Sequence, residues 1–242
     1  MKVIKVKNYE ELSRTAATII AGVILSKPDC ILGLATGSSP VGTYDQLAAM
    51  YEEGILDFSH VKSVNLDEYV GLDGSNDQSY RYFMEHNLFS HVDIDPARTH
   101  VPDGACPDAA AACAAYEQSI AEAGGLGLQL LGLGHNGHIG FNEPAPEFPK
   151  ETHCVELTES TINANSRLFD SIDDVPREAY TMGIGTIMAA KEILVVANGS
   201  DKADIVRRAF FGPVTPEVPA SILQFHPNVT VVVDKEAGAL CQ

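Results

Sequence analysis

The sequence predicts an α/β protein with a three-layer, Rossmann-like fold, in which helices cover both faces of a mostly parallel central sheet. Two observations lead to this prediction. Short, wholly apolar segments such as Cys30–Ala35 have the length of buried strands, and they recur along the chain. Segments with helical periodicity lie between them. A strand that is apolar on both sides must be covered on both faces, as helices do in parallel sheets.

The first part of the chain alternates strands and helices. Val3–Val6 alternates apolar and polar residues like a strand, and Asn8 with Glu11 three residues later is typical of a helix start. The helix after Asn8 has apolar residues on one face, namely Tyr9, Leu12, Ala16, Ile19, Ile20 and Val23. Further elements are expected at Cys30–Ala35 (strand), Val41–Tyr51 (helix), Val61–Leu66 (strand) and Ser79–Leu88 (helix).

The second part continues the alternation with one interruption. Pro144–Lys150 carries three prolines and cannot form a regular helix or a central strand. It predicts an excursion, a lid segment within about residues 144–180, before the chain returns to the sheet near Tyr180. The other expected elements are Pro107–Ala123 (helix), Leu128–Leu131, Tyr180–Met182, Ile193–Ala197 and Val229–Val233 (strands), and a helix capped by Ser200 that runs through Phe210.

The composition bounds the kind of protein. The chain has 242 residues without a compositional break, which predicts a single domain spanning residues 1–242. Lysine and arginine total 16 against 33 acidic residues, which gives a formal net charge of -17. This charge disfavours nucleic acid and anionic membranes as partners, and no apolar run is long enough to cross a bilayer.

Cysteine usage and the first residues predict the compartment. The five cysteines are odd in number and form no C-x-x-C pair, so neither a disulfide framework nor a zinc cage is expected. The start, MKVIKVKNYE, lacks the apolar core of a signal peptide. Together these features predict a cytoplasmic protein.

Residues just after each strand are the candidates for function, because ligands in parallel α/β folds bind beyond the carboxyl ends of the strands. Thr36, Gly37, Ser38 and Ser39 follow the strand CILGLA. Small residues and a glycine before a helix expose backbone N–H groups that can hold a phosphate. A tight turn with an ordinary serine or threonine helix cap fits the same residues, so both interpretations stay open.

Charged side chains stand after other strands. Asp67 follows Val61–Leu66, where a buried carboxylate can act as a general base, while a helix cap or a surface acid is the alternative. Lys202, in the first turn of the helix after Ser200, is unfavourable for the helix dipole unless an anion binds there too. Arg167 is a second candidate cation, although a single arginine is usually solvated.

The segment GLGHNGHIGFNEP, Gly132–Pro144, holds the densest group of candidates. Its first six residues fit the dinucleotide fingerprint G-x-G-x-x-G, but prolines soon follow where that fingerprint needs a helix. A metal site is also disfavoured, because His135 and His138 lie in a glycine turn with no helix to align their rings. His138 can be an acid/base group oriented by Glu143, or a histidine bonded only to backbone.

Four segments, LDEYVGL, GLGHNGHIGFNEP, NSRLF and GSDKA, together resemble one family. In them, and along almost the whole chain from LGLATGSSPVGTY to the last strand, the sequence resembles the glucosamine-6-phosphate deaminases, also called glucosamine-6-phosphate isomerases. The related 6-phosphogluconolactonases share a G-x-G-x-D-G-H core but continue with an ASLFP-like run, where this chain reads IGFNEP.

The resemblance implies an aldose–ketose isomerisation coupled to deamination in amino-sugar catabolism. Glucosamine 6-phosphate and water would give fructose 6-phosphate and ammonia. By the same resemblance, His138 held by Glu143 moves the proton in ring opening, Asn136 contributes to ring opening, and Asp67 accepts the C2 proton. The implied phosphate ligands are Thr36, Gly37, Ser38, Ser39, Arg167 and Lys202. No metal and no cofactor are implied.

The resemblance leaves some points open. Some family members have aspartate where this chain has Asn136, and an amide can orient His138 without carrying charge for it. We expect a monomer or a small homo-oligomer, without activation by N-acetylglucosamine 6-phosphate, because the stretch Pro146–Thr152 is not rich in basic residues. A lactonase acting on 6-phosphogluconolactone and a sugar-phosphate sensor without catalysis are the alternative functions.

Overall fold

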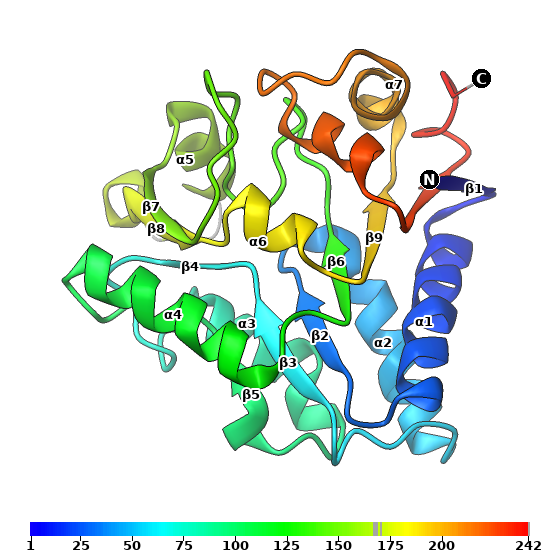
Figure 1. Ribbon diagram of the computed structural model, residues 1–242, viewed down its shortest axis with the longest axis horizontal. Helices are drawn as coiled ribbons and strands as arrows, with labels where there is room; N and C mark the ends of the chain where they lie inside the picture. Colours follow the sequence, from blue (N-terminus) through cyan, green and yellow to red (C-terminus); the bar gives the residue numbers. More distant parts are fainter. Residues whose placement is uncertain (167–168, 170, 242) are drawn as a thin grey trace.

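The computed structural model describes residues 1–166, 169 and 171–241. These residues contain a seven-stranded sheet of order β1-β10-β9-β6-β2-β3-β5, in which every neighbouring pair is parallel (Figure 1). Its strands are β1 (Lys2–Val6), β2 (Ile31–Leu34), β3 (Lys62–Asn65), β5 (Thr99–His100), β6 (Leu128–Leu131), β9 (Glu192–Ala197) and β10 (Val229–Asp234). The prediction of a mostly parallel central sheet is confirmed.

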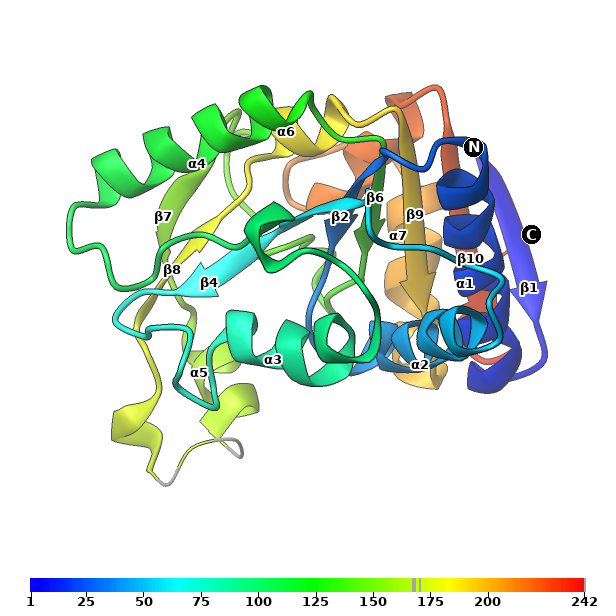
Figure 2. The same cartoon turned by 90° about the horizontal axis from the view of Figure 1, so that it is seen from below.

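Helices cover both faces of this sheet. The α-helices are α1 (Tyr9–Ser26), α2 (Ser38–Glu52), α3 (Tyr80–Asn87), α4 (Ala109–Ala123), α5 (Glu159–Asn165), α6 (Ile184–Met188) and α7 (Ala203–Phe211). Figure 2 shows α1, α2 and α3 on one face of the sheet and α4 and α6 on the other. Short 3-10 helices complete the chain: η1 (Phe89–His91), η2 (Pro96–Arg98), η4 (Ile172–Asp174), η5 (Ser200–Lys202) and η6 (Pro219–Phe225). No described helix is long and apolar enough to span a membrane.

Local sequence signals explain how the first helix begins. The Asn8 side chain accepts a hydrogen bond from the Glu11 N–H at 2.9 Å, as the predicted helix start requires. The residues of α1 that face the sheet, among them Leu12, Ala16 and Ile20, are fully buried. Burial of this face against the sheet supplies most of the stability of such a helix.

A second, antiparallel sheet was not predicted. It has the order β4-β8-β7, with β4 at Asp67–Tyr69, β8 at Glu178–Thr181 and β7 at His153–Glu156. The chain passes from one sheet to the other at Leu66, whose N–H donates to Leu34 O in the central sheet (3.1 Å) and whose carbonyl accepts from Met182 N (2.7 Å). The strand predicted near Tyr180 therefore belongs to this small sheet and not to the central one.

The segment predicted as an excursion has structure of its own. Pro144–Lys150 forms neither helix nor strand, as predicted, but β7 and α5 follow it. A separate apolar cluster packs this region onto β4, and it consists of Tyr69, Phe141, Leu157, Ile162, Val175 and Ala179. The cluster thereby fixes the excursion to β4, which follows β3 of the central sheet along the chain.

The strand order reverses between β2 and β6. From β2 the chain moves outward through β3 to β5, whereas from β6 it moves the other way through β9 to β10. Such a reversal opens a crevice at the carboxyl ends of the two central strands. Tyr44 of α2 fixes one wall of this crevice, because its buried hydroxyl donates to Ala35 O (2.5 Å) and accepts from Ala35 N (3.2 Å).

We predict that Tyr44→Phe lowers the free energy of unfolding by about 1–3 kcal/mol, because it leaves the buried N–H and carbonyl of Ala35 without partners. Tyr51→Phe is the matched control on the same helix, since no described residue forms a hydrogen bond with the Tyr51 hydroxyl. Urea denaturation of the three proteins measures the difference. Equal losses in both variants would contradict the assigned role of the Tyr44 hydroxyl.

Candidate active site

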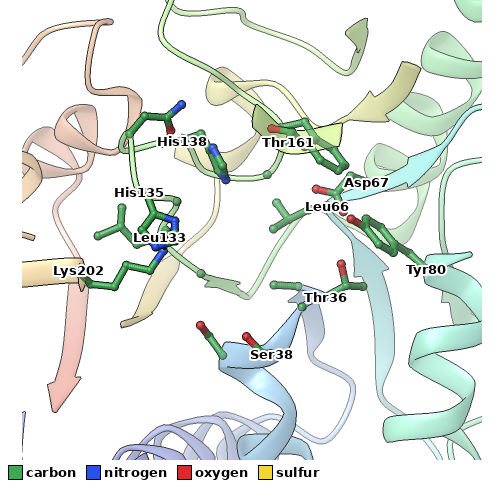
Figure 3. A pocket seen from close by; sticks show the side chains of 18 residues that line it. Thr36, Ser38, Leu66, Asp67, Tyr80, Leu133, His135, His138, Thr161 and Lys202 are labelled. Atoms are coloured by element: carbon green, nitrogen blue, oxygen red, sulfur yellow. Dashed lines mark hydrogen bonds between the residues drawn. The ribbon is translucent and has the colours of Figure 1, made fainter. Parts of the chain in front are cut away.

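A cavity of about 440 Å³ lies at this crevice, beyond the carboxyl ends of β2, β3 and β6 (Figure 3). Its lining comes from six parts of the chain: Ala35–Ser39, Leu66–Asp67, Tyr80, part of Gly132–Phe141, Thr161 and Lys202. The cavity therefore collects residues that are far apart in sequence at the position where the fold predicts a ligand.

Asp67 forms one side of the cavity. It is the first residue of β4, only 6 % exposed, and its register partner across the small sheet is Thr181. No described residue donates a hydrogen bond to its carboxylate. Burial, together with the negative charge of Glu68, raises the pKa of Asp67 to about 8. A carboxyl group with such a pKa is a much stronger base than an exposed one.

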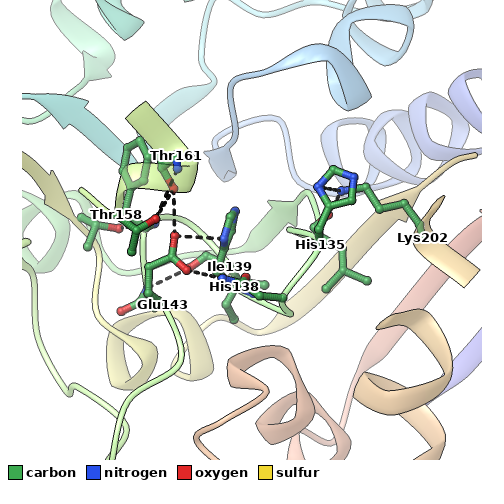
Figure 4. Close-up of polar contacts among 12 residues, drawn as sticks. His135, His138, Ile139, Glu143, Thr158, Thr161 and Lys202 are labelled. Atoms are coloured by element: carbon green, nitrogen blue, oxygen red, sulfur yellow. Dashed lines mark hydrogen bonds and ion pairs between the residues drawn. The ribbon is translucent and has the colours of Figure 1, made fainter. Parts of the chain in front are cut away.

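Glu143 connects three side chains at the top of the cavity (Figure 4). Its Oε1 lies 3.2 Å from His138 Nδ1 and accepts a hydrogen bond from Thr161 Oγ1 at 3.1 Å, and its Oε2 accepts from Asn136 Nδ2. The His138 contact is close but is not aligned as a hydrogen bond. Burial raises the pKa of Glu143, but its contacts with His138, Asn136 and Thr161 outweigh this, so the net shift is downward. Glu143 therefore remains an anion beside the imidazole.

The turn that carries these residues depends on its glycines. Gly137 has a φ of 91°, a left-handed conformation that side chains disfavour. A Cβ at Gly134 would lie 2.3 Å from the His138 ring, so only glycine lets the ring fold back over the turn. After Gly137 the chain forms an isolated bridge between Ile139 and Asn142, not a helix. The dinucleotide interpretation of GLGHNG is therefore wrong.

The two histidines of this turn serve different neighbours (Figure 4). His135 Nε2 lies 2.6 Å from Asp201 Oδ2, and its Nδ1 lies 3.3 Å from Lys202 Nζ, whereas His138 contacts Glu143. Within the described part of the chain, no group of His, Cys, Asp and Glu side chains could hold a metal ion. His135 and His138 thus belong to two separate polar clusters on one cavity wall.

The small-residue turn after β2 ends in a helix without a side-chain cap. The helix α2 begins at Ser38, three residues earlier than predicted, and Gly37 with a φ of 92° is its N-cap. The alternative of an ordinary serine or threonine cap is therefore wrong. Thr36, Gly37, Ser38 and Ser39 all line the cavity, so the positive end of the helix dipole is directed at its contents.

Lys202 lies across the cavity from Asp67 (Figure 3). Its ammonium donates to Leu133 O (2.9 Å) and forms no ion pair with any described carboxylate. Burial lowers the pKa of Lys202. Ser200 is not the cap that was predicted: it begins the 3-10 helix η5, and Lys202 is itself the N-cap of α7. Arg167, the other predicted cation, lies outside the described residues.

Two cavity residues were missed by the sequence reasoning. Tyr80 is the first residue of α3, and its ring packs on Phe141 with centroids 6.1 Å apart. Thr161 lies in α5, within the predicted excursion, and hydrogen-bonds Glu143. A tyrosine after the helix cap Ser79 and a threonine in a helix carry no chemical signal, because only the tertiary fold brings them to the cavity.

The fold and the cavity together define a parallel α/β protein with a carboxylate and histidine site at one end and an uncapped helix end and a lysine at the other. The chain belongs to the family described as glucosamine-6-phosphate isomerases/6-phosphogluconolactonase, whose profile matches residues 6–232. The family resemblance inferred from the four sequence segments is thereby confirmed.

Individual relatives are similar over nearly their full length. The chain is 58% identical to a glucosamine-6-phosphate deaminase from Lachnoclostridium phytofermentans, covering 96% of this chain and 98% of the relative. It is 55% identical to one from Clostridium perfringens, covering 99% of both. A solved structure described as a monomeric glucosamine-6-phosphate deaminase superposes with a TM-score of 0.96 at 47% identity, covering 99% of this chain and 100% of that one.

We predict that Asp67→Asn stabilises the protein increasingly as the pH rises. Because the folded-state pKa of Asp67 lies above the ordinary carboxyl value, the contribution of protonated Asp67 to the free energy of unfolding is fully present at low pH. This contribution is lost as the pH rises to about 8. Asparagine cannot ionise, so the variant avoids this loss, and each unit between the folded and unfolded pKa corresponds to about 1.4 kcal/mol.

Urea denaturation from about pH 5 to about pH 9 tests this difference. Asp204→Asn is the control, since Asp204 is an exposed acid paired with Arg207 at the surface. A stability difference between Asp67→Asn and wild type that stays constant over the whole range would contradict the burial of an ionisable carboxyl.

Proposed function

We propose that this protein converts glucosamine 6-phosphate and water to fructose 6-phosphate and ammonia. One observation carries the proposal: a buried carboxylate, Asp67, lies across a cavity from Lys202, which forms no ion pair with a described carboxylate, and the same cavity holds His138. A sugar phosphate has the same polarity, with an anion at C6 and its reacting carbons at the other end. The full-length relatives at 50–58% identity, each named a glucosamine-6-phosphate deaminase, support the same activity.

The phosphate is assigned to the end of the cavity formed by Thr36–Ser39 and Lys202. The uncapped N-terminus of α2 offers backbone N–H groups, and the small side chains of this turn leave them accessible. Lys202 adds a positive charge that forms no ion pair with a described carboxylate, although the neighbouring Asp201 attracts it. Arg167 is proposed as a further ligand from its place in NSRLF alone. In a protein with a net charge of -17, this local arrangement is what makes an anion site possible.

Ring opening is assigned to His138. The proton must leave the anomeric hydroxyl and reach the ring oxygen, and an imidazole at the cavity wall can accept and donate it. Glu143, whose Oε1 lies 3.2 Å from His138 Nδ1, orients the ring. Asn136 bonds both to Glu143 and, through Oδ1, to the His138 N–H at 3.1 Å, so its proposed role is to fix the geometry of the pair.

Isomerisation is assigned to Asp67. Its carboxylate takes the proton from C2 of the open-chain aldose, and the C2–H electrons form the enolamine double bond while the C1 carbonyl oxygen takes a proton from water and becomes a hydroxyl. A proton then returns to C1, which leaves an imine at C2. Water adds to that imine and ammonia leaves, giving the ketose. Asp67 suits the first step because burial makes it a strong base near neutral pH.

Further proposals complete this picture. We propose that residues 1–242 work as one domain and that the segment of about residues 144–180 acts as a lid, which a site with a reactive enolamine would benefit from. We also propose that the protein acts in the cytoplasm as a monomer or small homo-oligomer on a small-molecule substrate, without nucleic acid. The similarity to a structure described as monomeric supports the lower end of that range.

The activity is tested by mixing the purified protein with glucosamine 6-phosphate, without added metal or nucleotide, and measuring ammonia and fructose 6-phosphate in equal amounts. A parallel assay with 6-phosphogluconolactone tests the alternative, for which solved lactonase structures at about 20% identity support only the fold. Lactone hydrolysis without ammonia release would overturn the proposal, and tight binding of glucosamine 6-phosphate without turnover would favour a sensor.

We predict that Asp67→Asn lowers kcat by about 10²–10⁴-fold, because it removes the general base, and that it abolishes exchange of the C2 hydrogen with deuterated water. His138→Gln is expected to slow turnover through ring opening. His153→Gln is the control, since His153 is a half-buried histidine on β7 that contacts Glu151 O. Near-normal ammonia release from Asp67→Asn, or an unchanged rate in His138→Gln, would remove that residue from the mechanism.

A further inference from the structure

Glu68 is a buried carboxylate that the proposed reaction does not use. It follows Asp67 on β4, and because successive side chains on a strand point to opposite faces, only Asp67 lines the cavity. Glu68 is 2 % exposed, so two adjacent carboxylates are both withdrawn from water. Burying a second charge beside the first costs free energy, and the hydrogen bonds of Glu68 offset this cost.

The contacts of Glu68 are with the first turn of α3. Its Oε1 accepts from Tyr80 N (2.8 Å) and from Tyr69 N (2.9 Å), and its Oε2 accepts from Arg81 N (3.0 Å). The N–H groups of Tyr80 and Arg81 are among those that a helix start leaves without partners. Burial raises the pKa of Glu68, and the three partners, all of them donors, counter part of this rise by favouring the ionised carboxylate.

Arg81 is the cation nearest to Glu68 among its described contacts, and it attracts the carboxylate without forming an ion pair with it. The guanidinium of the neighbouring Arg81 instead donates to Thr99, at 2.6 Å to Oγ1 and 2.8 Å to the carbonyl oxygen. Within the described residues Glu68 forms no ion pair. Its negative charge is therefore balanced mainly by backbone N–H groups and the dipole of α3.

The anchored helix end carries a cavity wall. Tyr80, whose N–H is bound by Glu68, lines the cavity beside Asp67, and its ring lies 4.9 Å from the ring of Tyr69 and stacks on Phe141 (Figure 3). The placement of this ring against the base therefore depends on the anchor.

We propose that Glu68 is a positioning residue for proton transfer: it fixes the start of α3, and with it the Tyr80 wall, and it holds a negative charge behind Asp67 that strengthens Asp67 as a base. This inference rests on the proposed function, in which Asp67 takes the C2 proton. The carboxylate acts through its neighbours and does not touch the substrate.

Among the described titratable groups that face Asp67, Glu68 is the one that adds a negative charge beside it. These groups are Glu68 on β4, Tyr80 on α3, Tyr116 on α4 and His138 after β6. Burial raises the pKa of Tyr80 and of Tyr116 well above the ordinary value, so both phenols are neutral. The negative charge of Glu68 acts with burial to raise the pKa of Asp67.

The test compares Glu68→Gln, Glu68→Asp and Ser79→Ala in pH profiles of kcat/KM. Ser79 caps the same helix through Tyr82 N (3.0 Å), so Ser79→Ala weakens α3 without removing a charge. Removal of the negative charge lowers the pKa of Asp67. In Glu68→Gln the acidic limb of the profile, where kcat/KM rises as Asp67 ionises, therefore moves to lower pH by about one unit. At the optimum, kcat/KM is expected to fall about tenfold, because the weaker base transfers the proton more slowly. Ser79→Ala lowers Tm and leaves the limb in place.

Glu68→Asp keeps the charge but shortens the reach to α3. In Glu68→Asp the acidic limb of kcat/KM is expected to stay at the wild-type pH while KM rises. This variant replaces Glu68→Gln in the test if Glu68→Gln does not fold. A limb that stays in place in Glu68→Gln, or that moves equally in Ser79→Ala, would overturn this inference while leaving the proposed function intact. A limb displaced in Glu68→Asp, or an unchanged KM in that variant, would do the same. A wild-type protein that releases no ammonia would instead overturn the proposed function.

Discussion

The burial of the Asp67 carboxylate at the point where the chain leaves the central sheet constrains the rest of the site. A carboxylate there would be an ordinary acid if the strand β3 ended in an exposed loop. Because Leu66 hydrogen-bonds to both sheets, the chain continues directly into β4, and Asp67 pairs with Thr181 of β8 in the small sheet. The same continuity places the proposed base at the cavity and requires the other strands of the small sheet, β7 and β8, to be in place.

The second constraint is separation of charge. Among the described residues, no cation contacts Asp67 at its end of the cavity. Lys202 and the start of α2 form the opposite end. A lysine close to Asp67 would favour its ionised form and weaken it as a base. The sheet order keeps Asp67 and Lys202 apart, because Asp67 follows β3 and Lys202 follows β9, on either side of the crevice between β2 and β6.

Sequence patterns predicted the parts of the site that depend on parallel strands. The carboxyl ends of such strands meet at one edge, so Thr36, Asp67 and His138 could be expected together from the order of the apolar segments alone. The small sheet could not be predicted, since β4 has only three residues and pairs with Thr181, far along the chain. Short polar strands carry no periodic signal, and for the same reason the contribution of Thr161 was not foreseen.

Thr161 also changes how the excursion is understood. Had this segment only covered the cavity, its contacts with the site would be apolar and replaceable. Instead the Thr161 hydroxyl donates to the same Glu143 oxygen that lies beside His138, so the excursion supplies part of the polar network around the imidazole. Any displacement of α5 would remove one of the bonds that keep Glu143 ionised. Glu143 therefore has its full set of contacts beside His138 only when the excursion packs against it.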